Sequence, residues 1–477
     1  MAFFTLNLIL IGDIMNKPYS NRLAQHLLSG LCVAGIFSVL SPAPAAAQSL
    51  WQQPNLLGDM GGLRTALGNY GVTLSLSDSE NLLGNYTGGT RKGTTMQGVT
   101  TGVLELDTAK AFGWQGGTFH VSGLQIHGRA LTSSYLDNLQ AANGNEAENT
   151  TRLWELWYDQ TFDYNLADLK IGQQSIDNEF MVSKYSGLFV NTMAGWPLIP
   201  SDDLYGGGPA YPLSSLGARI QFKPSDNQDI LAGVFNDNPG GGSFSDDAQH
   251  LDRHGTKFNF NTGALFIAEY QYSVNQPAVG DMVTNPNQSQ GLPGTYKIGF
   301  WYDTGFFPDQ RYGTDGLSLA NAASNGQPIM HHGNYSFYAV ADQTIWQSSA
   351  DAARNLNLFG RIMGSPDKQN MISFFLNGGI TMAAPLPGRE NDQMGMDFGI
   401  GKVSSRLAGL DRDSGNKAQT TEELVELTYQ AQVTPWLVLQ PDVQYVFNPG
   451  AGIPDPSDPT HNLRNELVAG ARFITTF

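Results

Sequence analysis

The chain ends in the stretch ELVAGARFITTF (residues 466–477), which has the pattern of a β-strand with one apolar face. Successive side chains of a strand point to opposite sides, so every second residue shares a face. The residues of this face are Leu467, Ala469, Ala471, Phe473, Thr475 and Phe477. A terminal aromatic residue on such a strand is similar to the signal read by the outer-membrane barrel assembly machinery, which we therefore expect to bind Phe477. The alternative is the last strand of a soluble sheet.

The same two-residue alternation recurs along the chain after residue 47. It is clear in VTLSLS (72–77), WELWYD (154–159), YKIGFWYD (296–303) and VELTYQA (425–431). The pattern predicts 16 strands, which begin near residues 72, 98, 118, 152, 168, 215, 229, 263, 295, 334, 355, 371, 394, 422, 436 and 463. An even number of strands suits a bacterial barrel whose ends lie on one side of the membrane. We therefore expect an all-β fold, a transmembrane antiparallel β-barrel of about 16 strands over residues 72–477.

The connectors between these strands tend to alternate between long and short, as expected for long outer loops and short periplasmic turns. Two connectors break this rule: residues 273–294 are long where a short turn is due, and residues 365–370 are short where a long loop is due. One strand assignment in this region is therefore open to revision. The longest connector, residues 177–214, is the third outer loop in this count, and it could either narrow the pore or pack on the surface.

Residues 1–47 have the pattern of a secretory signal peptide. Lys17 and Arg22 are basic, residues 27–40 are apolar, and three alanines precede Gln48. The only cysteine, Cys32, lies in this segment, so the exported chain would have no disulfide and no thiol site. Met15 is an alternative start. No later apolar run approaches the roughly 18 residues of a membrane helix, which leaves a soluble protein or a barrel in the bacterial outer membrane.

The residue pattern between the signal peptide and the first strand predicts a short helix. Leu63 and Leu67 lie one helical turn apart, Asp59 could cap the start, and Gly71 could end the helix. A bare linker is the alternative, because Gly61 and Gly62 are adjacent. We thus divide the chain into a signal peptide (1–47), an N-terminal helical segment near the periplasmic mouth (48–71) and the barrel (72–477).

The charge and the motifs exclude several classes of function. A formal net charge of −17 argues against nucleic acid as a partner. The sequence contains no G-x-S-x-G elbow, no P-loop and no H-E-x-x-H motif, so we expect no enzymatic activity and no cofactor. The pairs His250/His254 and His331/His332 lie in predicted loops, and a metal site at either would need a third ligand and a rigid geometry. We interpret them as solvated histidines.

Several short motifs, in this order, resemble the carbohydrate-selective porin family (OprB). They are LGDMGGLRT (57–65), GR (128–129), RLWELW (152–157), LKIG (169–172), Phe180, LPGTY (292–296), WLVLQPDVQY (436–445) and PG (449–450). The resemblance covers nearly the whole exported chain, and it implies a 16-stranded barrel with one pore per monomer that favours glucose and related sugars. One departure concerns Gln125 and Ile126, where pseudomonad members carry a Glu-Arg pair. This departure puts in doubt an arginine of the narrow eyelet, and hence the sugar preference.

Strand parity indicates which residues line the pore. If the large apolar residues face lipid, the alternate residues face the lumen. Carboxylates, amides and arginine can bind sugar hydroxyls, and aromatic rings can pack on the apolar face of a sugar. Parity gives as candidates for pore lining and sugar binding Glu155, Trp157, Asp159, Arg219, Trp301 and Asp303. Arg129 and Gln173 join them because they lie near the outer ends of their strands. For each of them, the alternative is a generic wet lumen position that never contacts sugar.

We therefore expect an outer-membrane porin for the passive, sugar-selective diffusion of small carbohydrates such as glucose. The alternatives are a general or small-acid-permeable porin and, from another class, an outer-membrane barrel enzyme. The expected partners are small sugars, outer-membrane lipid and lipopolysaccharide, and the assembly machinery.

Overall fold

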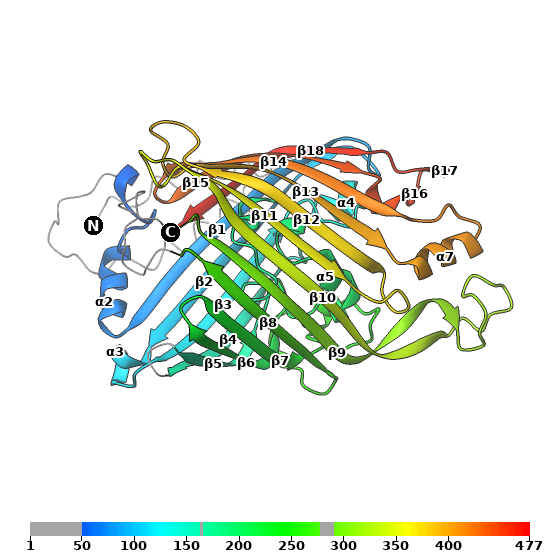
Figure 1. Ribbon diagram of the computed structural model, residues 1–477, viewed down its shortest axis with the longest axis horizontal. Coiled ribbons are helices and arrows are strands. Elements are labelled where there is room, and N and C mark those ends of the chain that lie inside the picture. The colour runs from blue at the N-terminus through cyan, green and yellow to red at the C-terminus, as the bar shows by residue number, and fades with distance from the viewer. Residues whose placement is uncertain (1–49, 163–165, 277–290) are drawn as a thin grey trace, which may run out of the picture.

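Sixteen antiparallel strands form one closed barrel in the computed structural model, which describes residues 50–162, 166–276 and 291–477. Each strand pairs with its neighbours along the chain, and β1 closes the barrel against β18, with Ser77 opposite Thr476 (Figure 1). The predicted fold class and the predicted number of strands are confirmed. The barrel strands are β1 (Val72–Thr87), β2 (Gly93–Asp107), β3 (Gly117–Gly128), β4 (Thr150–Phe162), β5 (Ala167–Gln174), β6 (Ser215–Ser225), β7 (Gln228–Asn236), β8 (Ala264–Val274), β9 (Gly294–Gly313), β10 (Pro328–Gln347), β11 (Asn355–Gly364), β12 (Ile372–Ala383), β13 (Gln393–Val403), β14 (Thr421–Thr434), β15 (Leu437–Phe447) and β18 (Glu466–Thr476).

The strands on either side of both irregular connectors belong to the barrel. Residues 275–293 join β8 to β9, and residues 365–371 join β11 to β12, while all four strands keep continuous antiparallel pairing. No strand assignment needs to be removed. A separate two-stranded sheet, β16 (Pro454–Asp455) and β17 (Asp458–Asn462), lies between β15 and β18 at the end of the barrel that carries α7 (Ser405–Asp413). None of the helices in the described ranges is long and apolar enough to cross a membrane.

The outside of the barrel is apolar because alternate residues of the strands carry large hydrophobic side chains outward. On β9, Ile298 is 63% exposed, whereas the neighbouring Trp301 points inward and is 0% exposed. One irregularity disturbs the parity. A bulge in the pairing of β3 with β4, between Val121 and Gly123, turns Trp154 inward. Trp154 packs there against Tyr211, with ring centroids 6.2 Å apart, and so does not face lipid as its parity with Leu156 predicted.

The N-terminal segment forms the predicted short helix and docks on the seam where the barrel closes. Asp59 accepts hydrogen bonds from Thr65 N and Oγ1, both at 2.9 Å, and α2 spans Leu63–Asn69. Arg64 donates to the carbonyl oxygens of Leu74, at 2.6 Å, and of Phe477. These contacts place α2 at the end of the barrel that holds the C-terminus (Figure 1). Short 3-10 turns, η2 (Leu50–Gln52) and η3 (Met60–Gly62), precede it.

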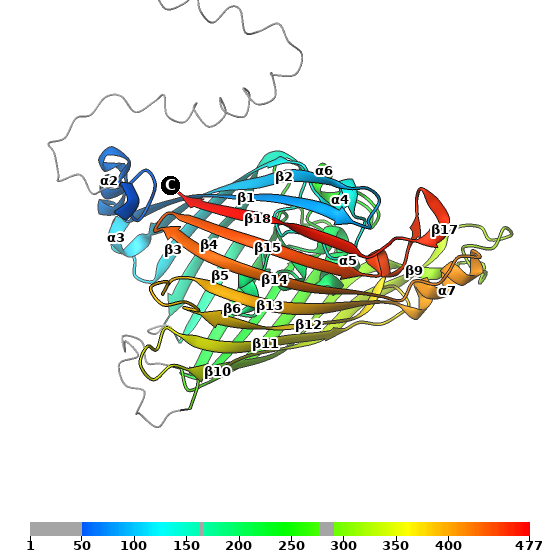
Figure 2. The ribbon, with the colours of Figure 1, turned by 90° about the horizontal axis from the view of Figure 1, so that it is seen from above.

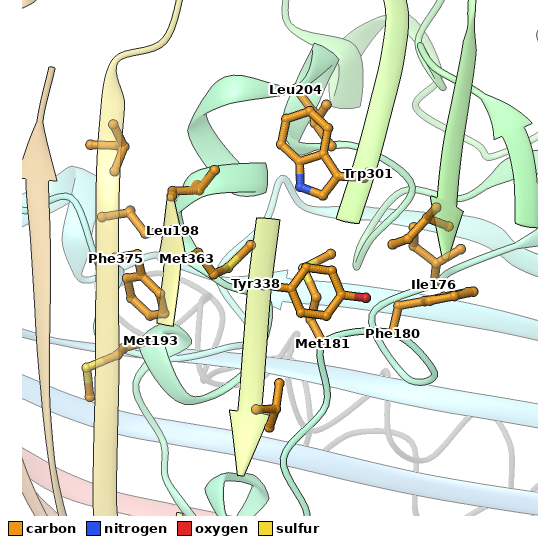
Figure 3. Packing of buried hydrophobic residues seen from close by; sticks show 14 of the residues in the cluster. Ile176, Phe180, Met181, Met193, Leu198, Leu204, Trp301, Tyr338, Met363 and Phe375 are labelled. Atoms are coloured by element: carbon orange, nitrogen blue, oxygen red, sulfur yellow. The ribbon is translucent and has the colours of Figure 1, made fainter. Parts of the chain in front are cut away.

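The long connector between β5 and β6, residues 175–214, folds into the barrel instead of over its surface, and we call it the inserted segment. It carries η5 (Ser186–Leu188), η6 (Thr192–Ala194), α5 (Leu198–Asp203) and η7 (Tyr205–Gly207). Its apolar residues, such as Phe180 and Leu198, form one buried cluster with inward-facing wall residues such as Trp301 and Phe375 (Figure 3). Figure 2 shows α5 enclosed by the strands. The remaining short helices are α3 (Thr108–Phe112), α4 (Thr132–Tyr135), α6 (Ala248–Leu251) and η8 (Pro449–Ala451).

Candidate pore-lining site

A chain of aromatic and charged side chains runs along the inner wall from β3 to β6. The imidazole ring of His120 stacks on the indole of Trp157, with centroids 4.4 Å apart and planes within 5°. Lys170 Nζ lies 4.5 Å from the centroid of the same indole. Two protein groups therefore already contact the π-system of Trp157. The indole of Trp157 holds His120 and Lys170 in place, and it therefore exposes a smaller ring surface to a sugar than the sequence suggested.

Arg219 lies at the centre of an acidic ring. Its Nε donates to Glu179 Oε2 at 2.8 Å, the guanidinium also pairs with Asp168, and its Nη2 lies 3.9 Å from Asp159 Oδ2. Glu179 belongs to the inserted segment and also pairs with Lys170. The Arg219 side chain is 5% exposed, whereas that of Glu179 is 20% exposed. The carboxylates are thus the groups that a solute would meet first.

Two further carboxylates, those of Glu105 and Glu155, flank the imidazole of His120. Its Nδ1 lies 3.1 Å from Glu105 Oε1, and its Nε2 lies 3.7 Å from Glu155 Oε2. Glu155 Oε1 accepts a hydrogen bond from Ser175 N at 3.1 Å, at the start of the inserted segment. The Glu105 side chain is 46% exposed. The chain of polar groups therefore runs from the buried carboxylate of Glu155 through His120 to the exposed carboxylate of Glu105.

Acidic residues on other wall strands, β8, β10 and β14, hold the inserted segment in place by accepting hydrogen bonds from its backbone. Glu426 accepts from Val190 N and Asn191 N, at 2.6 and 3.1 Å. Two further backbone amides of this segment donate to wall carboxylates, Met181 N to Glu269 and Lys184 N to Asp342. The hydroxyl of Ser183 also donates to Asp342. These carboxylates therefore fix the segment that supplies Glu179.

Arg361 reinforces this attachment from β11. Its guanidinium donates to the carbonyl oxygens of Met181, Met193 and Gly195, at 3.1, 2.5 and 2.7 Å. A second connector, residues 129–149, is tied to the wall in the same manner. Glu422 accepts from Leu139 N at 2.8 Å. Both connectors thus attach through backbone groups, which constrain the path of the chain more than the identity of its side chains.

Water is largely excluded from parts of these two connectors, which shifts the titration of their acids. Burial raises the pKa of Glu146 to about 7, although the backbone and the hydroxyl of Thr132 donate to this carboxylate. Burial likewise raises the pKa of Asp202 to about 7, and the nearby Glu422 adds to this effect. The neutral forms of both acids are therefore favoured where the connectors pack inside the barrel.

Four of the sequence candidates, Glu155, Trp157, Asp159 and Arg219, meet in the network above. The other four lie elsewhere. Asp303 points inward as parity predicted, but it is fully buried. Gln173 has the same parity as the exposed Ile171, yet it is buried and donates from Nε2 to Ser214 Oγ at 2.9 Å. Trp301 is enclosed by the inserted segment (Figure 3). Arg129 is exposed beyond the end of β3, where it donates to Ser134 Oγ at 2.9 Å. None of these four contributes to the network.

Sequence reasoning missed Glu105, His120, Asp168, Lys170 and Glu179. Lys170 alternates with Leu169 and Ile171, so parity alone could have placed it inside. Glu179 carries no comparable signal, because it lies in a connector whose path depends on distant wall residues. Within the described residues, one group of His, Asp and Glu side chains has the spacing to hold a metal ion, Asp78, Glu80 and His127, and it lies outside the network.

A closed barrel with an apolar exterior, a segment folded into its lumen and a charged inner wall defines an outer-membrane porin. Residues 91–477 match the model of the carbohydrate-selective porin family, OprB, and the chain belongs to this family. The chain is 25% identical to Porin B of Pseudomonas aeruginosa over 502 aligned positions, which cover 97% of this chain and all of Porin B. It is therefore a carbohydrate-selective porin of the bacterial outer membrane.

Two solved structures share the fold. The high-pH structure of Pseudomonas putida OprB has a TM-score of 0.76 at 22% identity and covers 90% of this chain and 100% of its own. The low-pH structure of the same protein has a TM-score of 0.52 at 18% identity and covers 89% and 99%. These likenesses concern the fold.

Proposed function

We propose that glucose and closely related sugars are the preferred substrates, and that they pass along the network of Glu155, Trp157, Asp159 and Arg219. Lys170 and Glu179 complete this path. The observation that carries the proposal is the position of Glu179, which brings the inserted segment into contact with both Lys170 and Arg219. The lumen there presents carboxylates and cationic donors side by side. Paired donors and acceptors match the vicinal hydroxyls of a sugar.

The charges of this network are paired, which favours a neutral solute over an ion. A sugar hydroxyl can donate to a carboxylate and accept from an ammonium or guanidinium group within one hydrogen-bond length. A free anion would have to compete with Asp168 and Glu179 for Arg219. A general or small-acid-permeable porin, the rival function, would need unpaired cations in this place.

The test is block of single-channel current by glucose in a planar bilayer, together with sugar uptake into liposomes. Glu179→Gln should weaken the glucose block several-fold, because one ionic acceptor is replaced by a neutral one. Glu148→Gln, an exposed acid of the connector 129–149, is the matched control and should behave as the wild type does. Faster uptake of small carboxylates than of glucose by the wild type would favour the rival function.

Export and assembly complete the proposal. Residues 1–47, the expected signal peptide, lie outside the described residues, and N-terminal sequencing of the exported protein should begin at Gln48. Phe477 closes the alternating last strand, and we assign it to recognition by the assembly machinery. Deleting Phe477 should leave the chain aggregated or degraded in the periplasm. Unchanged outer-membrane levels of the deletion variant would remove this role.

Lipid and lipopolysaccharide are the proposed surroundings of the barrel. A groove at the rim opposite the C-terminus is lined by Lys92 and Arg464 beside the apolar Tyr445 and Leu467. Two cations above an apolar band suit the phosphates and acyl chains of lipopolysaccharide. Lys92→Gln combined with Arg464→Gln should reduce the amount of lipopolysaccharide that copurifies with the protein. An unchanged amount would contradict this contact.

A further inference from the structure

Three ionisable residues point out of the barrel on β1 and β3. On β1, the inward side chains include Asn81 and Leu83, at 2% and 1% exposure, so Asp78 and Glu80 share the outward face with Leu82, which is 44% exposed. On β3, Ile126 is buried on the inner side, so its neighbour His127 faces outward. This orientation is unusual, because the outward face of a membrane barrel contacts hydrocarbon.

The strand register brings these three side chains together. Glu80 lies opposite Gly98 of β2, and Gly98 lies opposite His127 of β3. Gly98 leaves room for the contact, since a Cβ atom in its place would lie 2.4 Å from the Glu80 carboxylate. His127 Nε2 lies 2.5 Å from Glu80 Oε1. One ligand atom from each of Asp78, Glu80 and His127 lies within 4.8 Å of the other two.

Two further observations indicate that this group holds a ligand. The second carboxylate oxygen of Glu80, Oε2, is buried and has no hydrogen-bond partner among the described residues. Asp78 is oriented by Thr100, whose Oγ1 donates to Asp78 Oδ1 at 2.6 Å. A buried acceptor without a hydrogen-bond partner points to an unseen ion. In metal sites, a neighbouring group commonly orients a ligating carboxylate through a hydrogen bond, as Thr100 does for Asp78.

The surroundings make a bound cation favourable. Two carboxylates carry two negative charges, and outward-facing apolar residues flank them, among them Met96 and Phe473, at 53% and 38% exposure. Unpaired charge on the lipid face destabilises a barrel, most strongly near the middle of the bilayer. A protonated His127, 2.5 Å from Glu80, would cancel only one of the two charges, whereas a single divalent cation would cancel both and use the neutral imidazole as a ligand.

We propose that Asp78, Glu80 and His127 bind one divalent transition-metal ion on the outer wall of the barrel. Two oxygens and one imidazole nitrogen suit Zn²⁺ and similar ions, whereas Ca²⁺ and Mg²⁺ prefer oxygen ligands alone. Binding would separate His127 Nε2 from Glu80 Oε1 by a few tenths of an ångström, since ligands about 2.0–2.2 Å from one metal lie roughly 3 Å or more apart. The ion would join β1 to β3 across β2.

The test is calorimetric titration of Zn²⁺ into the tag-free, chelator-washed protein in detergent, followed by the same titration with Ca²⁺. One Zn²⁺ site per chain, with much weaker binding of Ca²⁺, is the expected result. Glu80→Gln and His127→Gln should each weaken Zn²⁺ binding by at least about tenfold, since even the loss of an outer-shell partner costs this much. The matched control is His461→Gln, because His461 and Asp458 form a His–carboxylate pair, 2.9 Å apart, without a third ligand.

Gly98→Ala is a second variant, which keeps all three ligands but displaces the Glu80 carboxylate. It should also weaken binding. Folding of every variant is checked by the heat-dependent electrophoretic mobility of the barrel. Absence of a Zn²⁺ site in the wild type overturns the proposal, and so does equal binding by the wild type, Glu80→Gln, His127→Gln and Gly98→Ala. In either case the carboxylates would have to be neutralised by protons or by a cationic partner.

Discussion

Replacing Arg219 with glutamine should make the pore more selective for cations. The side chain pairs with surrounding carboxylates, with Nε 2.8 Å from Glu179 and Nη2 3.9 Å from Asp159. Lys170 would then be the cation left beside these acids in the network. Glutamine keeps much of the volume and one donor group, so the charge is the main change.

The size of the effect follows from Coulomb's law. In a water-filled lumen, a unit charge about 6 Å from a passing ion contributes about 0.7 kcal/mol. The sign is opposite for potassium and chloride, so the ratio of their permeabilities should change by about tenfold. Screening at about 0.1 M salt, where the Debye length is about 10 Å, reduces this to several-fold. Sugars are neutral, so glucose block should weaken only through lost hydrogen bonds, on the order of 1 kcal/mol.

The assay is the reversal potential of single channels in a potassium chloride gradient, with glucose block recorded on the same channels. Arg129→Gln is the matched control, because it removes the same charge from the exposed rim beyond β3. Arg219→Gln should shift the reversal potential toward that of potassium, and Arg129→Gln should shift it far less. Equal reversal potentials for the two variants, or a wild-type value for Arg219→Gln, would refute the placement of Arg219 beside the ion path.

Three further predictions concern the connectors. Glu426→Gln should speed amide hydrogen exchange at Val190 and Asn191 several-fold, since each of the two hydrogen bonds is worth about 0.5–1.5 kcal/mol. Glu423→Gln on the same strand should not change it. Burial raises the pKa of Glu146 from its usual 4.5 to about 7. The packing of its connector is therefore most stable below pH 4.5 and weakens as the pH rises through 7. Hydrogen exchange, corrected for its intrinsic pH dependence, should show this trend, and Glu146→Gln should abolish it. An impermeant maleimide should label Glu148→Cys on whole cells and leave Asp226→Cys unlabelled, and the reverse pattern would invert the assigned orientation of the barrel.

The strands could be predicted from the sequence because each is specified locally. An outward residue meets lipid wherever it lies in the barrel, so the alternation of apolar and polar residues repeats in every strand. Trp154 shows the limit of this rule. The bulge beside Gly123 shifts the parity by one residue, and a bulge is a property of two paired strands that one strand's sequence does not reveal.

The lumen could be predicted only in part, because parity gives direction and not accessibility. Arg219 and Trp301 both point inward, yet the first joins a charged network and the second is buried. The difference depends on which part of the wall the inserted segment covers. That choice rests on contacts between residues far apart in the chain, such as Glu426 with the backbone of Val190. No pattern within one strand encodes such a contact.

The same contacts change what the net charge of −17 implies for the pore. Acids such as Glu422 and Glu426 are fully buried and accept hydrogen bonds from backbone amides. These acids therefore hold the connectors and are shielded from the solute, and the lumen need not be strongly cation-selective even though the chain is acidic. The field that a solute meets depends on exposed groups such as Glu105 and on whether Arg219 keeps its partners. Selectivity in this porin is therefore expected to respond to single substitutions in the network and to be insensitive to the loss of an acid outside it.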